Sequence, residues 1–307
     1  MPFATSGLQS TRITTRTGAH PTHQRGVTLI ELMVGIAIGL LVVAVAMGAL
    51  MVSRGVSGTV TDASSIQQQA SYAMRVIGQQ IRQAGSLRLN LDPKSTATAE
   101  KYLAPVAFET MAAASTNPTY SFDAGQATNV IQGTASPVTV TTGFRRYTEP
   151  VFISASEQTL GRNCLGGPSD SGNDDQRVES VFQFDTANNI LLCNGNGAGG
   201  QALIQNVANF QVNYLVQDIT TTPGIPTIKS VNATGVANWG QVQAVEVCLV
   251  IYGAEPIDLP AGSNYTDCDG TTLVDMSTLT GSRAKRMHMV FRNVFQLRSQ
   301  GLIGTVL

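Results

Sequence analysis

One apolar segment near the N-terminus constrains this 307-residue chain more than any other feature of its sequence. Between Val27 and Ser53 the only charged residue is Glu31. An apolar run of about 20 residues is long enough to cross a bilayer as an α-helix. Residues 1–26 contain three arginines and no acid, which orients the N-terminus toward the cytoplasm. We therefore expect everything after this segment to be exported.

Glu31 distinguishes the segment from a plain membrane anchor. A carboxylate inside hydrocarbon costs a few kcal/mol, and intramembrane acids usually serve a function. A mitochondrial transit peptide is amphipathic, and a cleaved secretory signal has a shorter apolar core followed by its cleavage site. Here the apolar run continues directly into a helical pattern, which fits neither. An uncleaved signal anchor stays open, as does the reading of Glu31 as a snorkelling interfacial acid.

The sequence R-G-V-T-L-I-E-L-M-V, from Arg25 to Val34, resembles the processing site of type IV prepilins. The resemblance implies that a prepilin peptidase cuts between Gly26 and Val27 and methylates the new amine of Val27. It also implies that Glu31 pairs with the N-terminal amine of a neighbouring subunit. The helix dipole favours an anion so close to a helix N-terminus. Gly35 and Gly39 form a G-x-x-x-G step, which permits close helix packing but is common by chance.

Beyond Arg54, apolar residues recur at steps of three and four, which predicts an amphipathic helix ending near Gly85. The stripe consists of Ile66, Ala70, Ala73 or Met74, Ile77, Ile81 and Ala84. We expect it to pack against a globular head.

Short β-type runs follow residue 86, between clusters of Gly, Pro, Asn and Ser. The clearest predicted strands are 138–142, 181–184, 210–216, 242–251 and 287–297, while 86–136 and 219–238 are expected to be rich in loops. The predicted fold class is therefore α+β and pilin-like, with one long N-terminal helix packed on a β-rich head. Its expected segments are a cleaved leader (1–26), a transmembrane half-helix (27–53), an amphipathic half-helix (54–85) and the head (86–307).

The head resembles that of PilW-type minor pilins, which are related to J-type minor pseudopilins. The resemblance rests on C-L-G at Cys164, V-E-S-V-F at Val178, L-L-C-N-G at Leu191, A-L-I-Q-N-V at Ala202, F-Q-V-N-Y at Phe210 and F-R-N-V-F-Q-L-R at Phe291.

Four cysteines lie in the exported part, where disulfides are allowed: Cys164, Cys193, Cys248 and Cys268. Three pairings are possible, and the sequence alone does not choose among them. The family resemblance favours the most local set, Cys164 with Cys193 and Cys248 with Cys268.

The sequence offers little material for catalysis or cofactor binding. The motif G-N-G-A-G-G from Gly195 satisfies a dinucleotide-binding pattern, but a strand-like alternation follows it where a helix is needed. His288 lies inside a predicted strand and is expected to be structural. We expect no metal site, since the cysteines lack C-x-x-C spacing. Asp170, Asp174 and Asp175 leave calcium binding open as an alternative.

These features together predict a structural subunit and no enzyme or cofactor. Residues 27–307 carry 16 basic and 20 acidic side chains, so direct binding of nucleic acid is not expected. The resemblance implies a minor pilin of a type IV pilus that helps to prime assembly near the tip. Its implied partners are minor and major pilins, prepilin peptidase, the inner-membrane assembly platform and a tip adhesin.

The implied location is the inner membrane, crossed once with the N-terminus cytoplasmic and the head periplasmic, and afterwards the pilus. Two alternatives remain open: a minor pseudopilin of type II secretion, and a signal-anchored periplasmic enzyme or binding protein.

Overall fold

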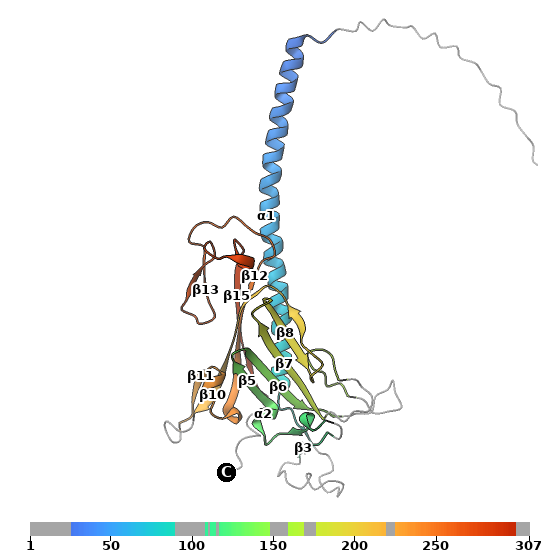
Figure 1. The fold of residues 1–307 in the computed structure, drawn as a ribbon, viewed down its shortest axis with the longest axis vertical. Coiled ribbons are helices and arrows are strands. Elements are labelled where there is room, and N and C mark those ends of the chain that lie inside the picture. The colour runs from blue at the N-terminus through green and yellow to red at the C-terminus, as the bar shows by residue number, and fades with distance from the viewer. Residues whose placement is uncertain are drawn as a thin grey trace, which may run out of the picture. The chain divides into compact units, whose positions relative to one another are not determined.

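A single helix, α1 (Leu29–Gln83), forms the N-terminal part of the computed structural model (Figure 1). The structure describes residues 26–89, 108–109, 111–114, 117–147, 159–168, 176–218 and 225–298. The chain divides into two compact units, residues 1–54 and 55–307. The second half of α1 therefore belongs to the same unit as the strands. Residues 1–25 of the expected leader lie outside the described residues.

The predicted apolar stripe is the buried face of α1. Ile66, Ala70, Ala73, Ile77, Ile81 and Ala84 are each at most 1% exposed, and Met74 is half-buried. The helix ends at Gln83, and Gly85 adopts the left-handed conformation (φ 69°) that glycine reaches without steric cost. Its N–H donates to the carbonyl of Gly143 (2.9 Å), so the end of the helix is joined to a strand. The predicted stop near Gly85 is confirmed.

Five antiparallel strands form the larger sheet, in the order β5-β6-β7-β8-β9. Their bounds are β5 (Ile131–Ala135), β6 (Val138–Arg145), β7 (Arg177–Asp185), β8 (Ile190–Gly195) and β9 (Gln201–Ile204). Because β8 and β9 pair directly, the glycine-rich segment from Gly195 is a turn between two strands. This agrees with the prediction that no helix opens there.

Four antiparallel strands form the second sheet, in the order β11-β10-β12-β15. Their bounds are β10 (Val207–Asp218), β11 (Thr227–Val231), β12 (Val242–Tyr252) and β15 (His288–Gln296). In β10, Phe210, Val212 and Tyr214 are buried, as their strict alternation predicted. The predicted strands of the head are thus present, with bounds that differ by a few residues at several ends.

The remaining elements are short. They are α2 (Ala127–Val130), β1 (Arg88–Leu89), β2 (Phe108–Glu109), β3 (Met111–Ala112), β4 (Phe122–Asp123), β13 (Asn264–Thr266) and β14 (Leu273–Asp275). Single 3₁₀ turns cover Pro118–Tyr120, Ala233–Gly235, Trp239–Gln241 and Gly281–Arg283. Six of the described strands, β1 to β5 and β11, fall in segments where the sequence led us to expect loops.

One hydrophobic core joins the stripe of α1 to both sheets. A buried polar connection runs beside it. Ser180 in β7 donates to Gln80 Oε1 of α1 (3.0 Å) and accepts from the Cys164 N–H (3.0 Å). Gln80 Nε2 in turn donates to the Arg162 carbonyl (3.2 Å). Because each buried polar group has a partner, this connection fixes α1 against the sheet without the penalty of an unpaired amide.

Asp62 attaches α1 to the segment that follows β12. Its carboxylate is 4% exposed and accepts from the backbone N–H groups of Ala254 (3.2 Å) and Glu255 (3.0 Å). A side chain at Gly253 would overlap this carboxylate, so a glycine is required for the close approach. From the other side, Arg286 Nη1 donates to the Gly253 carbonyl (2.9 Å). Bonds of this kind to a charged acceptor are among the stronger ones in proteins.

Candidate functional site

The residues that precede α1 are accessible. Gly26, Val27 and Thr28 have no regular secondary structure and are exposed, and the Val27 side chain is 71% exposed. A Cβ added at Gly26 would meet no atom within 4 Å. The structure thus presents the Gly26–Val27 peptide bond on irregular, uncovered backbone, which is the form of chain that a peptidase can enter.

Thr28 and Glu31 form a reciprocal cap at the start of α1. Thr28 donates to Glu31 Oε2 from its backbone N–H (2.9 Å) and from its hydroxyl (2.8 Å), and the Glu31 N–H donates back to Thr28 Oγ1 (3.3 Å). This is a capping box, which satisfies two amides that a helix start otherwise leaves unpaired. Our predictions from the sequence did not include this cap, although the spacing T-x-x-E is its known signature.

The cap also orients the carboxylate of Glu31. Both bonds from Thr28 go to Oε2, and no bond to Oε1 is found within the described residues. The carboxylate is therefore held at the first turn of the helix, with Oε1 available for a further bond. Glu31 itself is exposed and has no ion-pair partner in the described part of the chain.

The first part of α1 exposes apolar side chains all the way around. Leu29–Met51 has a mean hydropathy of 2.7, and none of these residues is buried. Gly35 and Gly39 are equally uncovered, since a Cβ at either position would meet no atom within 4 Å. A surface of this kind requires lipid or other helices around it. Length and composition suffice for one membrane crossing by this helix.

Two families match parts of this sequence. The profile described as "Type IV Pilus-assembly protein W" covers residues 171–299, and the profile described as "Prokaryotic N-terminal methylation motif" covers residues 21–47. The second includes the exposed peptide bond, the capping box and both glycines, and the first includes most of the strands of the head. The chain is a type IV pilin-like protein with a PilW domain.

The predicted family is thereby confirmed, and it points to a structural, non-catalytic protein that is processed as a prepilin and anchored in a membrane. Among solved structures, a type IV-like pilin from Thermus thermophilus matches with 14% identity over 76% of this chain and 96% of that one, at a TM-score of 0.34. None of the curated proteins matches the sequence.

Two disulfides stabilise the head of this pilin-like protein. Cys164 joins Cys193 in β8, with their Cα atoms 6.3 Å apart, and Cys248 in β12 joins Cys268, with their Cα atoms 5.6 Å apart. These are the local pairs that the family resemblance favours. Each disulfide joins a cysteine inside a strand to a cysteine in a connecting segment, so each closes a loop whose conformational freedom would otherwise oppose folding.

His288 is part of a buried aromatic stack. Its ring lies parallel to that of Tyr265 (centroids 5.2 Å apart) and is tilted against Tyr252 (5.7 Å). Arg283 Nε donates to its Nε2 (3.3 Å), and Nδ1 lies 2.9 Å from the Arg286 carbonyl. Burial, with a smaller contribution from the Arg283 charge, lowers the pKa of His288 to about 4, against the opposing effects of the Arg286 carbonyl and Asp267.

His288 is thus held neutral by packing, which supports a structural role. Among the residues that the structure describes, no group of three His, Cys, Asp or Glu side chains is placed to hold a metal ion. Asp170, Asp174 and Asp175, the alternative calcium ligands, lie outside the described residues.

Proposed function

We propose that this protein is a minor pilin that is cut between Gly26 and Val27, methylated on Val27 and built into a type IV pilus, where it helps to prime assembly near the tip. In this proposal residues 1–26 are the leader, 27–53 the assembly segment, 54–85 the helix that carries the head and 86–307 the head. Before assembly the subunit crosses the inner membrane once, with its head in the periplasm. Its partners are other pilins and the assembly platform.

One observation carries the proposal: a carboxylate with an available oxygen stands at the first turn of a helix that is apolar and uncovered over Leu29–Met51. Glu31 is costly in hydrocarbon, and a cationic amine from a neighbouring subunit would offset that cost. The amine is created by the cleavage itself. Processing and assembly are thereby linked, because an uncut chain has no such cation to offer its neighbour.

Gly35 and Gly39 have a secondary role in the proposal. With no side chain on either, a neighbouring helix can approach this face of α1 more closely than it could approach a face of leucines. Packing at short range then adds to the charge pairing at Glu31.

The first experiment measures the intact mass of the full-length protein purified from its native host. The expected mass is that of residues 27–307 plus one CH2, because a methyl group replaces one amine hydrogen, less two hydrogen atoms for each of the two disulfides. Recovery of pili that contain a chain starting at Met1 would contradict the proposal.

The second experiment replaces Glu31 with Leu and compares Thr28→Ser as the control, since serine can form the same cap. We expect Glu31→Leu to insert in the membrane at least as well as the unmodified chain but to be largely absent from sheared pili. Thr28→Ser should be recovered normally. Equal recovery of Glu31→Leu in pili would exclude the pairing role, and an effect on protein secretion without any effect on pili would favour the pseudopilin alternative.

A further inference from the structure

Residues 253–287 form a small lobe beside the four-stranded sheet, and we call this segment the cover. Its strands β13 and β14 pair with each other, and β13 lies beside β15 (Figure 1). Alternation along β12 turns Cys248 and Val250 away from the core that contains α1. Tyr265 and Cys268 of the cover pack against these two residues, and a disulfide joins the two cysteines. The cover therefore buries this part of the outward side of β12.

His288, the first residue of β15, connects three separate parts of the cover to the sheet. Its ring is stacked on that of Tyr265 in β13, with the centroids 5.2 Å apart. Its backbone N–H donates to Sδ of Met276, which follows β14 (3.3 Å). Arg283, near the end of the cover, donates from Nε to the imidazole Nε2 (3.3 Å) and from Nη2 to the Tyr265 hydroxyl (2.9 Å). The parts of the cover thus meet at one imidazole.

The hydrogen bonds of His288 require a neutral ring. A guanidinium can only donate, so Nε2 is an acceptor, and the ring proton on Nδ1 is donated to the Arg286 carbonyl (2.9 Å). A second ring proton, on Nε2, would place two donors and two positive charges against each other. Because His288 is 4% exposed, water screens that repulsion only weakly. A closed cover and a charged His288 therefore oppose each other.

Asp267 is the one nearby carboxylate that favours a charged His288. Its Oδ1 already accepts from Asn209 Nδ2 (2.9 Å) and from the Cys268 N–H (2.7 Å), so it is held by other donors. Its effect on His288 is smaller than that of burial, which favours the neutral ring.

The remaining groups around the imidazole supply no negative charge. The guanidinium of Arg286 is turned to the Gly253 carbonyl (2.9 Å). The rings of Tyr252 and Tyr265 lie against His288, and burial raises the pKa of Tyr265, so its hydroxyl stays protonated. An imidazolium at this position would thus meet the Arg283 cation without a carboxylate bonded to it.

We propose that protonation of His288 opens the cover while the rest of the head stays folded. The bond from Arg283 is lost, and with it the contacts that Tyr265 and Met276 make at the same residue. The main core contains neither His288 nor the cluster under the cover, so the two sheets and α1 keep their packing. The Cys248–Cys268 disulfide keeps the open cover attached. Opening uncovers Val250, an apolar side chain that the closed cover buries completely.

Proton linkage determines how strongly the opening depends on pH. Burial, with a smaller contribution from the Arg283 charge, lowers the pKa of His288 to about 4 when the cover is closed. An exposed histidine has a pKa of about 6.5, so the open form takes up the proton first as the pH falls. The ratio of open to closed molecules should therefore rise about a hundredfold between pH 7 and pH 4. The opening is a property of the head alone and does not depend on the proposed role in a pilus.

The test is hydroxyl-radical footprinting of the full-length protein in detergent micelles at pH 7 and pH 4, with the labelled tyrosines identified by mass spectrometry. The reporter is Tyr265, which is 8% exposed under the closed cover. We expect its labelling to rise at least threefold at pH 4. Tyr214, fully buried in the main core, is the matched control and should stay unlabelled at both pH values. Constant labelling of Tyr265 would overturn the proposal, as would an equal rise at Tyr214, which would mean that acid loosens the whole head.

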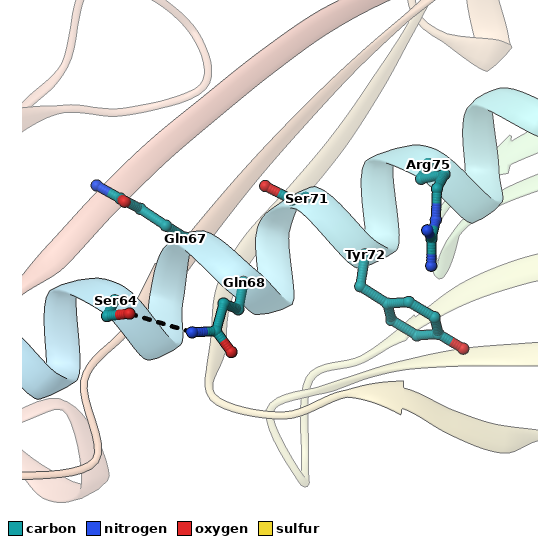
Figure 2. Close-up of a pocket in the computed structure, with 6 residues that line it drawn as sticks. All are labelled: Ser64, Gln67, Gln68, Ser71, Tyr72 and Arg75. Atoms are coloured by element: carbon teal, nitrogen blue, oxygen red, sulfur yellow. Dashed lines mark hydrogen bonds between the residues drawn. The ribbon is translucent and has the colours of Figure 1, made fainter.

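Tyr72 supplies the reference for labelling at each pH. It is 44% exposed, and Figure 2 shows it at a pocket along α1. The other residues that line this pocket are Ser64, Gln67, Gln68, Ser71 and Arg75. None of these six is a histidine or a carboxylic acid, the residue types that titrate between pH 4 and pH 7. Labelling of Tyr265 and Tyr214 is therefore expressed relative to Tyr72.

His288→Gln removes the proton-binding group and keeps a side chain with both a donor and an acceptor. We expect its Tyr265 labelling to be equal at pH 7 and pH 4. A rise at pH 4 as large as that of the unmodified protein would show that His288 does not control the cover.

NMR of the unmodified protein provides a measurement that does not depend on how the variant folds. The carbon-13 signal of the His288 ring is assigned by its absence from His288→Gln and is followed as the pH falls. The midpoint of its titration should coincide with the midpoint of the rise in Tyr265 labelling. A ring that titrates with no rise at Tyr265, or a rise at Tyr265 while the ring stays neutral, would contradict the coupling between them.

Discussion

Whether Gly78→Ala raises or lowers the free energy of unfolding tests how α1 packs on the head. Gly78 lies on the buried side of α1, and a Cβ built there would overlap the ring of Phe295 in β15. Phe295 is itself 2% exposed, and the Arg82 guanidinium carbon lies 5.4 Å from the centre of its ring. Gly78→Ala therefore forces the Phe295 ring to move, although this ring has little free space around it.

Two opposing effects determine how much Gly78→Ala changes the free energy of unfolding. Alanine is favoured over glycine by about 1 kcal/mol inside a helix. Overpacking a well-filled site costs about 1–3 kcal/mol. The expected result for Gly78→Ala is a net loss of about 1 kcal/mol in the free energy of unfolding. Gly58→Ala is the matched control, since a Cβ there meets no atom within 4 Å and the change should be neutral or stabilising by up to about 1 kcal/mol.

The assay is urea unfolding of the full-length protein in detergent micelles, followed by tryptophan fluorescence. The chain has a single tryptophan, Trp239, whose ring packs edge-on against the buried Tyr214 at 4.9 Å between centroids. Combining Gly78→Ala with Phe295→Leu should relieve the overlap and give a favourable coupling energy in a double-mutant cycle. If Gly78→Ala stabilises the protein as much as Gly58→Ala does, α1 is not packed against β15 in this way.

Three further predictions concern the head. Asp62→Ala leaves the amides of Ala254 and Glu255 without their acceptor, so the free energy of unfolding should fall by about 2 kcal/mol. Hydrogen exchange at these two amides should accelerate, and unchanged exchange would refute the attachment of α1 to this segment through Asp62. The pKa of His288 is about 4 in the folded protein, below its unfolded value of about 6.5. Between these pH values the unfolded chain binds more protons than the folded one, so about 1–2 kcal/mol of stability should be lost as the pH falls through this range. His288→Gln should not show this loss. Replacing both Cys248 and Cys268 by Ser should lower the stability by about 3 kcal/mol, as a drop in melting temperature, and an unchanged melting temperature would contradict a structural disulfide.

Sequence reasoning succeeded where a local pattern carries the information. Strict alternation identified β10 because only one of its faces is fully buried, and it identified β12 although residues 247–252 are buried on both faces. The three-and-four spacing identified the buried face of α1. It missed β11, in which Thr227, Ile228, Lys229 and Ser230 are all exposed, so that no alternation marks the strand. The strand is held by backbone pairing with β10, which side-chain patterns do not report.

The sequence by itself determined the N-terminal site: the basic leader, the glycine before Val27, the lone Glu31 and the apolar run are contiguous, and even the missed capping box lies within four residues. Only the tertiary structure decided what the rest of α1 touches. Asp62 meets amides 192 and 193 positions further along the chain, and Gly78 faces a ring in the last strand. Periodicity shows that one face of α1 is covered, but it does not show which residues cover it. Those contacts depend on how the two sheets fold against the helix. The same packing places residues 202–206 beside Gln68, Gln69 and Tyr72 of α1, which no spacing in the helix could have indicated.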